Sequence, residues 1–365
     1  MTPVFGGRIR AAFAPPQYLA SPLSGVDIST SGVKVARLTE GPHGLTLSHY
    51  AQARLPLGVF TDGEIIDQKA IIEALQTTTQ ASGITAANVA LSESKAYLFE
   101  TTVPGAGKPQ WRLAIEQHLD ELVPLPPQET AFDIIGINRK ENGDESIVGV
   151  GFAQRMVDET LSVFDQANIS VRALEEETFA MARALLPVGD TSTTLIIDVG
   201  KTTTKMAIVT ARIPHFATTI GIGGHALTLA VQKHFGVTES EARKVKAERG
   251  IVPAAGNEDY LAAMLSTAAA IRDEISTRLT YWQEKAVVQG SHPPVSQVIL
   301  AGGNASVRGF PEYLEGALQI PVSAGDVFTN LASRDTWIPT LDYTESLAYT
   351  TAIGLALRDD TSRYE

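Results

Sequence analysis

The chain has 365 residues, 44% of them hydrophobic and 19% charged, and it carries a net charge of −12 at neutral pH. This balance is ordinary for a soluble protein of about two domains, the negative charge argues against general nucleic-acid binding, and no apolar run approaches the ~20 residues of a membrane span. The absence of cysteine excludes disulfides and thiolate chemistry, as is usual in the cytoplasm, and the seven histidines lack ligand-like spacing, so no structural metal site is expected.

The first quarter of the chain is expected to contain a flexible N-terminal arm followed by the first strands and the first helix of an α/β fold. Residues 1–22 are expected to form a flexible arm, because prolines interrupt their apolar stretch too early for a secretory signal. Apolar runs separated by turn residues predict a three-strand meander over residues 25–53, whose first strand ends at Asp27. A helix is predicted over residues 67–81 and a short buried strand over residues 88–91.

The pattern changes over residues 92–169, which we interpret as an inserted subdomain. An apolar stripe predicts one helix over residues 109–122, the Asn142-Gly143 turn predicts a β-hairpin around it, and a second helix is expected over residues 154–167. An exposed strand edge here could accept an extended peptide from a partner, although most edge strands stay solvated and protected. Both interpretations stay open.

Residues 171–186 follow the inserted subdomain and are assigned again to the first half of the fold. They contain three consecutive carboxylates, Glu175, Glu176 and Glu177, at the expected start of a helix. Negative charges at the start of a helix are favoured by the helix dipole, which is the simpler explanation. The alternative is catalytic, with Glu177 at the joint between the halves polarising a water that attacks a γ-phosphate.

The second half repeats the plan of the first. Three strands are predicted over residues 194–220, and Gly223-Gly224 then leads into a helix. A capping box predicts the start of a charged helix at residue 238. Apolar residues on one face between residues 264 and 282 predict one long helix, packed inside its own subdomain. The predicted elements that follow the three strands are helices over residues 225–235, 238–249, 264–282, 311–318 and 347–357, the last of them amphipathic, and a strand over residues 295–300.

Two similar stretches organise the chain, one at residues 25–35 with Asp27 and one at residues 195–206 with Asp198. Each has an apolar strand ending in the aspartate, a turn of glycine and hydroxyl residues, and a second strand with a basic residue inside it. Such turns offer backbone N–H groups and hydroxyls to an anion, and the aspartate can hold a hydrated Mg²⁺. Facing each other they would clamp a polyphosphate, and their recurrence suggests two related halves.

The order of these parts resembles the actin-like ATPase superfold of actin, Hsp70, sugar kinases, FtsA and MreB, and within it the PilM family of type IV pilus assembly. The resemblance implies an α/β, duplicated ribonuclease H-like fold of two lobes with an FtsA/PilM-type inserted subdomain 1C. It implies subdomains 1A (23–91, 170–190 and 345–358), 1C (92–169), 2A (191–224 and 295–344) and 2B (225–294). The stretches that carry it are Leu122-Val123-Pro124-Leu125-Pro126-Pro127 with Phe132-Asp133, residues 177–184, Gly221-Ile222-Gly223-Gly224, Leu300-Ala301-Gly302-Gly303, residues 309–314 and residues 352–358.

The resemblance also implies ATP and Mg²⁺ as cofactors. Asp27 and Asp198 would hold the Mg²⁺ through water. Two positions depart from the family pattern, since Ser29 stands where relatives usually have glycine and Arg243 where a glutamate is common. The phosphates would be bound by Ser29, Thr30, Ser31, Gly32, Lys34, Gly200, Lys201, Thr202, Thr203 and Thr204, and the nucleoside by Gly223, Gly224, Arg243, Lys246, Gly302, Gly303 and Asn304.

The function that the resemblance implies is a cytoplasmic ATP-binding scaffold, at most a slow ATPase, that captures the cytoplasmic tail of a PilN-like bitopic protein of the inner membrane. The tail would lie in a groove between subdomains 1A and 1C, with pilus motor and alignment-complex proteins as further partners. Two alternatives stay open: a filament-forming cytoskeletal protein like FtsA or MreB, and a small-metabolite kinase, for which the sequence offers no additional catalytic aspartate. The residues after Arg358 are too few and too acidic for the membrane helix expected of FtsA.

Overall fold

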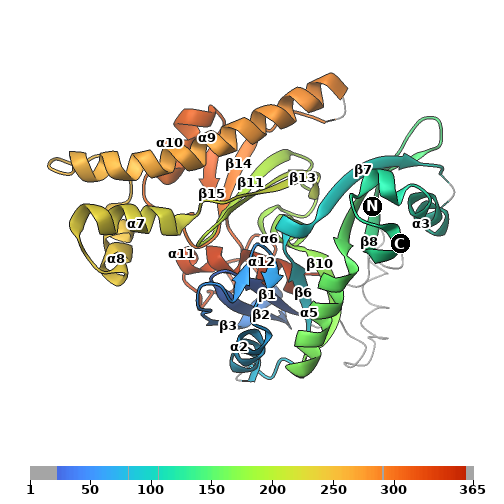
Figure 1. Cartoon of the computed structure of the whole chain (residues 1–365), viewed down its shortest axis with the longest axis horizontal. Helices are drawn as coiled ribbons and strands as arrows, with labels where there is room; N and C mark the ends of the chain where they lie inside the picture. The colour runs from blue at the N-terminus through green and yellow to red at the C-terminus, as the bar shows by residue number, and fades with distance from the viewer. Residues whose placement is uncertain (1–22, 81, 106, 290–291, 359–365) are drawn as a thin grey trace.

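The computed structural model describes residues 23–80, 82–105, 107–289 and 292–358. The predicted flexible arm of residues 1–22 lies outside these described residues. Two five-stranded sheets form the centres of two lobes, and a three-stranded sheet stands beside them. In Figure 1 the first lobe is at the bottom, the second lobe is above it, and the three-stranded sheet is on the right.

The first sheet has the strand order β3-β2-β1-β6-β10. Its first three strands are the predicted antiparallel meander, and the last two extend it in parallel. Alternate residues of the second strand enter different cores, with Val33 and Val35 on one face and Ala36 and Leu38 on the other, as expected for a strand covered on both faces. The strands are β1 (Ser24–Ser29), β2 (Gly32–Gly41), β3 (Gly44–Ala53), β6 (Ala86–Leu91) and β10 (Ser170–Glu176).

The second sheet repeats the same order and directions as β13-β12-β11-β14-β15. The register is repeated as well, because Asp27 lies opposite Lys34 and Asp198 lies opposite Lys205. The predicted duplicated α/β architecture is therefore confirmed. The strands are β11 (Thr193–Val199), β12 (Thr204–Thr210), β13 (Ile213–Ile220), β14 (Gln297–Ala301) and β15 (Val322–Ala324).

The last predicted helix is wrong in one respect, since it is not amphipathic. The segment divides into α11 (Tyr343–Ser346), the 3₁₀ turn η4 (Leu347–Tyr349) and α12 (Thr350–Ala356), and every residue of α12 is buried. The reason is its position against β1 and α6 (Glu177–Leu185). A Cβ on Gly354 would lie 1.9 Å from the backbone oxygen of Ala180, so the predicted close packing at this glycine is confirmed.

The three-stranded sheet has the order β7-β9-β8 and contains the predicted hairpin, β8 (Thr130–Arg139) and β9 (Glu145–Ala153). Sequence analysis missed β7 (Tyr97–Val103), whose polar centre hides the strand pattern. The single helix expected over residues 109–122 is wrong: α3 (Lys108–Glu116) ends where the His118 N–H bonds to the Ile115 oxygen, and α4 (Leu119–Leu122) restarts. Short elements nearby are η2 (Glu93–Lys95), η3 (Pro127–Glu129), β4 (Phe60–Thr61) and β5 (Glu64–Ile65).

The helices that cover the sheets follow the predictions closely. They are α2 (Gln68–Gln80), α5 (Gln154–Gln166), α7 (Gly224–Phe235), α8 (Glu239–Arg249), α9 (Glu258–Gln289) and α10 (Phe310–Leu318). The capping box of Thr238 and Glu241 is present at α8. The predicted seam of α9 from Met264 to Trp282 is buried in a core that both lobes share, and the helix extends beyond the seam at both ends. Its packing inside a subdomain of its own stays a prediction. No described helix is both long and apolar enough to span a bilayer. The subdomain boundaries stay predictions.

Candidate functional site

A cleft of about 1090 Å³ lies between the two lobes. Its walls include the turn between β1 and β2, the turn between β11 and β12, the start of α7, part of α8, and the turn after β14. These turns follow the carboxyl ends of strands, which is where ligands bind in α/β folds. The cleft therefore brings the two similar turns to one place.

In the first turn, Lys34 ties the loop together. Its ammonium nitrogen lies 3.7 Å from a carboxylate oxygen of Asp27, and both side chains are only 8% exposed. Lys34 Nζ also donates to Ser31 Oγ at 2.9 Å, and Ser31 Oγ lies 3.0 Å from Ser29 Oγ. The turn thus presents a cation surrounded by hydroxyls, which suits an anion.

In the second turn, Asp198 has no such partner. Its carboxylate makes no hydrogen bond or ion pair with the residues that the structure describes, although Gly302 approaches so closely that a Cβ there would lie 2.0 Å from Asp198 Oδ1. The turn is held by amide groups instead: Gly200 N donates to the Thr203 oxygen at 3.0 Å, and Asn304 Nδ2 donates to the Gly200 oxygen at 2.9 Å. The Asp198 carboxylate is consequently available to a cation.

Contacts between the lobes cross the cleft floor. Thr202 Oγ1 donates to Thr30 Oγ1 at 2.9 Å, so the two similar turns touch. Lys205 Nζ on β12 lies 2.5 Å from Glu177 Oε2 at the start of α6. The other Glu177 oxygen accepts from the Glu93 N–H at 2.7 Å. One buried carboxylate therefore connects both lobes with η2.

Around Glu177 at the cleft floor, carboxyl groups outnumber ammonium groups. Burial raises the pKa of Asp27, of Asp198 and, to about 7, of Glu93. Burial acts to lower the pKa of Lys205, but the nearby carboxylates of Glu177, Asp198 and Asp27 outweigh it and the net shift is upward. A divalent cation would offset this excess. The groups are four carboxylates, Asp27, Glu93, Glu177 and Asp198, and two ammonium groups, Lys34 and Lys205.

The wall predicted to face the nucleoside is fastened by Lys246 of α8. Its Nζ donates to Asn304 Oδ1 at 2.7 Å and to the Gly224 oxygen at 3.0 Å. Burial lowers the pKa of Lys246 to about 8. A Cβ on Gly224 would lie 2.0 Å from Asn304 Cγ, so glycine is required there. Arg243 also lines the cleft and pairs with Glu239 at 2.5 Å. Lys246 therefore joins α7, α8 and the turn after β14 into one wall.

Most of the predicted site residues line this cleft, and four do not: Gly32, Thr202, Thr204 and Gly223. Thr204 is buried and donates to the Ile222 oxygen at 2.7 Å. A Cβ on Gly32 would lie 2.2 Å from the backbone oxygen of Ala53, and one on Gly223 would lie 2.7 Å from Thr203 N. Gly32, Thr204 and Gly223 therefore support the turns, whereas the Thr202 hydroxyl contacts Thr30 of the other lobe. Direct contact of these four residues with a ligand stays a prediction.

Sequence analysis missed some residues of the cleft. Lys205 was noted only as a basic residue in a strand, although its repeated position opposite the aspartate is a detectable signal. Thr350 and Thr351 also line the cleft, from the C-terminal helix. They belong to no local motif, so only the fold brings them there.

The three glutamates at the start of α6 have three different environments. Glu176 is the N-cap and accepts from the Thr178 N–H at 3.0 Å, so helix capping explains it. Glu175 forms an ion pair with Arg183. Glu177 faces the cleft with Lys205 and Glu93 as partners. Its proposed action on a water stays a prediction.

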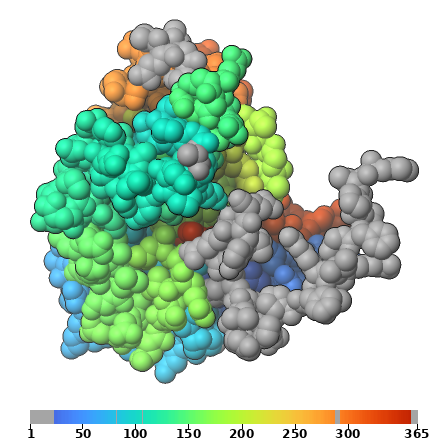
Figure 2. Space-filling view, turned by 90° about the vertical axis from the view of Figure 1, so that its right-hand side faces the viewer, coloured from blue at the N-terminus to red at the C-terminus, as the bar shows by residue number. Residues whose placement is uncertain are grey.

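A smaller hollow of about 240 Å³ lies between the three-stranded sheet and the first lobe. Figure 2 shows a recess between the teal and the green parts of the surface, with a small red area from near the C-terminus inside it. Among the described strands, β8 pairs with β9 alone, so one of its edges borders this hollow unpaired. The lining includes four charged residues, Asp133, Glu175, Glu176 and Arg358. The rest of it is apolar: Leu91, Ala131, Phe132, Ile134, Ile135, Val148, Val150, Phe152, Val157, Leu174 and Phe179.

Comparison with known proteins gives relatives for this architecture. A family model described as "Type IV pilus assembly protein PilM" matches residues 25–360. A solved "PilM-PilN type IV pilus biogenesis complex" has 18% identity and a TM-score of 0.76, covering 93% of this chain and 98% of that chain. The ethanolamine utilization protein EutJ from Carboxydothermus hydrogenoformans has 16% identity and a TM-score of 0.51 over 93% of each chain.

A further similar structure is MreB 5 of Spiroplasma citri bound to AMPPNP, with 13% identity and a TM-score of 0.54 over 93% of this chain and 96% of that chain. At these identities the likeness to solved structures shows the shared actin-like fold.

Proposed function

The chain belongs to the PilM family of type IV pilus assembly proteins, and from this membership we propose that it is an ATP-binding scaffold that captures the tail of a PilN-like membrane protein. The family match extends over nearly the whole described chain, so the shared feature is the entire architecture. In this proposal the nucleotide binds in the cleft and the tail binds in the smaller hollow.

One observation carries the nucleotide part of the proposal: two turns of the same design, one from each lobe, face a single cleft. The volume of about 1090 Å³ is sufficient for a nucleotide, since small-molecule pockets measure about 300–1,000 Å³. Hydroxyls and the Lys34 ammonium would bind the phosphates from the first lobe. Backbone groups around Gly200 would bind them from the second lobe.

The surplus of carboxylates supports Mg²⁺ beside the phosphates. Mg²⁺ in proteins keeps several waters and is usually held by one or two carboxylates together with substrate phosphates. Asp198 lacks any cationic partner at hydrogen-bonding distance within the described residues, and Asp27 lines the same cleft. These two carboxylates would hold the hydrated ion, which would offset the phosphate charge. We infer slow hydrolysis at most, because Glu177 is already engaged by Lys205 and by the Glu93 N–H.

The partner part of the proposal is supported by the hollow beside β8. An unpaired strand edge can add an extended peptide through its backbone groups, and neighbouring pockets then select the side chains. Phe179 of α6 faces this hollow and belongs to none of the protein's three main apolar cores. A tail with apolar side chains spaced along an extended backbone fits this surface. The protein would be held at the inner membrane through that partner.

Consecutive residues connect the two sites. Glu175 and Glu176 line the hollow, whereas Glu177 lines the cleft and meets Lys205 of the second lobe. A nucleotide that draws the lobes together would shift Glu177 through its ion pair with Lys205. The start of α6, which borders the hollow, would shift with it. We therefore propose that the nucleotide state alters the affinity for the tail.

The test measures two affinities by calorimetry, one for Mg-ATP and one for synthetic N-terminal tails of the bitopic membrane proteins encoded beside this protein. We expect Phe179→Ala to weaken tail binding at least tenfold while Mg-ATP binding stays unchanged. The matched control is Leu161→Ala on the exposed face of α5, which should change neither affinity. Equal tail affinity in Phe179→Ala and Leu161→Ala would overturn the proposed groove.

A further inference from the structure

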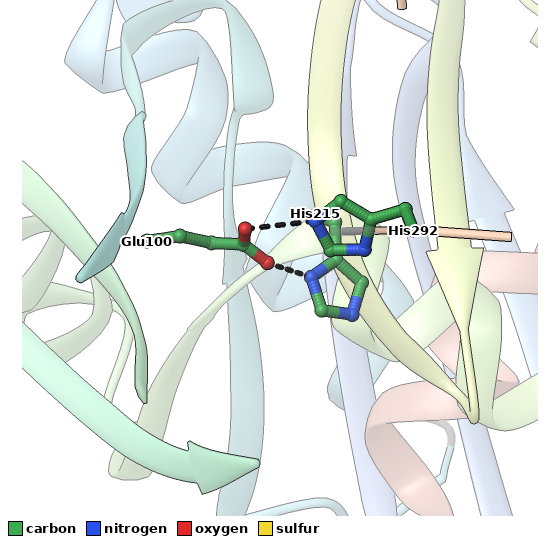
Figure 3. Close-up of side chains that lie close together, drawn as sticks. All are labelled: Glu100, His215 and His292. Carbon is green, nitrogen blue, oxygen red and sulfur yellow. Dashed lines mark hydrogen bonds and ion pairs between the residues drawn. The ribbon is translucent and has the colours of Figure 1, made fainter. Parts of the chain in front are cut away.

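Two histidines and a glutamate meet away from both the cleft and the hollow. Glu100 lies on β7, His215 on β13, and His292 in the segment between α9 and β14. Figure 3 shows the Glu100 carboxylate directed at the two imidazole rings. One ligand atom from each of the three side chains lies within 4.8 Å of the others. The fold thus assembles three metal-ligand types from distant parts of the sequence.

The distances suit a small metal ion. Glu100 divides its oxygens between the rings, one paired with His215 Nδ1 and the other 2.9 Å from His292 Nε2. Around tetrahedral Zn²⁺, ligand atoms bound at about 2.1 Å stand about 3.4 Å from one another. Both separations between Glu100 and the imidazole nitrogens are shorter than this value, so the carboxylate and the rings would move apart to admit an ion, and the three ligand atoms already lie within 4.8 Å of one another.

The donor set favours a borderline transition metal. Two imidazole nitrogens and one carboxylate oxygen are ligands of Zn²⁺ sites that keep a fourth position for water. Mg²⁺ and Ca²⁺ prefer oxygen ligands throughout. The carboxylate also contributes a negative charge, which attracts a cation. Zn²⁺ is therefore the appropriate probe, with Co²⁺ as its spectroscopic substitute.

The surroundings hold the rings in place. The His215 and His292 side chains are 3% and 11% exposed, whereas Glu100 is 33% exposed and leaves an approach from solvent. The Trp282 ring lies 4.9 Å from that of His292, and Phe216 lies 5.8 Å from Trp282. An aromatic shell of this kind limits ring rotation and lowers the local dielectric, and both effects strengthen a metal site.

The location gives the site a structural role. Both β7 and β13 are edge strands, one of the three-stranded sheet and one of the second lobe's sheet. We propose that Glu100, His215 and His292 bind one divalent transition-metal ion of the Zn²⁺ class, which fastens the inserted sheet to the second lobe. This inference does not depend on the proposed nucleotide or tail binding.

The test uses the full-length protein purified without a polyhistidine tag and freed of metal by chelation. Titration with Co²⁺ should produce visible d–d absorption that saturates at one ion per chain, and Zn²⁺ should displace the Co²⁺. Because the His215 side chain is only 3% exposed, the variants are His292→Gln and Glu100→Gln. Each should weaken Zn²⁺ binding at least tenfold. His118→Gln, whose side chain is 63% exposed on the inserted part, is the matched control and should bind like the parent.

A second measurement separates folding from metal binding. Saturating Zn²⁺ should raise the melting temperature of the parent and of His118→Gln by about 5 °C, because a ligand that binds only the folded state stabilises it. It should not raise the melting temperature of His292→Gln. If the parent and His292→Gln bind Co²⁺ and Zn²⁺ alike, the cluster is a metal-free hydrogen-bonded contact and the proposal is wrong.

Discussion

The two turns of the cleft share one design but use their lysines differently. In the first lobe Lys34 pairs with its own aspartate, Asp27, within the same turn. In the second lobe Lys205 lies opposite Asp198 in the same register, yet its ammonium group reaches across to Glu177 of the first lobe. The first turn is therefore internally balanced, whereas the second turn contributes its cation to the contact between lobes.

This difference teaches that a duplicated motif need not have a duplicated function. The self-paired first turn presents a fixed cation and hydroxyls, as a phosphate requires. The second turn leaves Asp198 without an ion pair among the described residues, although Lys205 lies near enough to lower its pKa, and so presents a carboxylate for Mg²⁺. The diverted Lys205 makes the relative position of the lobes sensitive to anything that binds beside Glu177.

The largest effect should come from removing the inter-lobe cation. Lys205→Met leaves Glu177 buried and still anchored by the Glu93 N–H, so we expect a loss of about 3–5 kcal/mol in the free energy of unfolding, as for other broken buried pairs. Denaturant unfolding followed by circular dichroism measures it.

The matched variant in the first turn is Lys34→Met. We expect Lys34→Met to lose less free energy of unfolding than Lys205→Met. Burial already raises the pKa of Asp27, so this carboxylate can take up a proton when Lys34 is removed. Equal losses in Lys205→Met and Lys34→Met would mean that the two turns are electrostatically equivalent, against the comparison drawn above.

The next prediction distinguishes Asp198 from Asp27 by two measured quantities, the affinity for Mg-ATP and the free energy of unfolding. Asp198→Ala should weaken Mg-ATP binding at least tenfold, about 1.4 kcal/mol, without lowering stability, because burial disfavours this carboxylate more than the nearby Lys205 and Lys34 favour it and its pKa is raised. Asp27→Ala should weaken Mg-ATP binding similarly but also lower stability, because it leaves Lys34 unpaired. Calorimetry and chemical unfolding give the two quantities.

The control for both aspartate variants is Asp165→Ala on the exposed face of α5, which should change neither quantity. Unaltered Mg-ATP affinity in Asp198→Ala would contradict the role of the second turn.

A smaller effect concerns the pH dependence of stability. Burial raises the pKa of Glu176 to about 8 and that of Glu93 to about 7, from the ordinary value of 4.5. Since the folded state holds these protons more tightly than the unfolded state, stability is complete below about pH 4.5 and falls as the pH rises toward 8. The slope is at most about 1.4 kcal/mol per pH unit for each group.

Glu176→Gln should flatten this pH dependence between pH 5 and 8, as measured by unfolding at a series of pH values. Glu176 belongs to the first lobe and Glu93 adjoins it, so the ionisation of these carboxyl groups would destabilise the first lobe's side of the contact between the lobes. An unchanged slope in Glu176→Gln would show that this carboxyl group does not bind the proton.

Local patterns were sufficient to predict the strands and helices with strong periodicity, including the long α9 and the hairpin around Asn142-Gly143. They were insufficient where tertiary context decides. The polar centre of β7 concealed a strand because its Glu100 is matched by histidines far along the chain. The fully buried α12 could not be distinguished from an amphipathic helix without its neighbours. The histidine cluster has no signal in sequence spacing, since only the fold joins its residues.

The smallest predicted effect concerns the direct contact between the turns, the hydrogen bond from Thr202 to Thr30 at 2.9 Å. A double-mutant cycle with Thr30→Val, Thr202→Val and the double variant should give a coupling of about 1 kcal/mol in unfolding. A triphosphate bound between the turns would accept hydrogen bonds from both hydroxyls in place of their bond to each other. The coupling should therefore vanish when Mg-ATP is saturating. A coupling that persists unchanged with Mg-ATP would place the phosphates elsewhere, because the same two hydroxyls cannot both remain paired with each other and contact a ligand inserted between them.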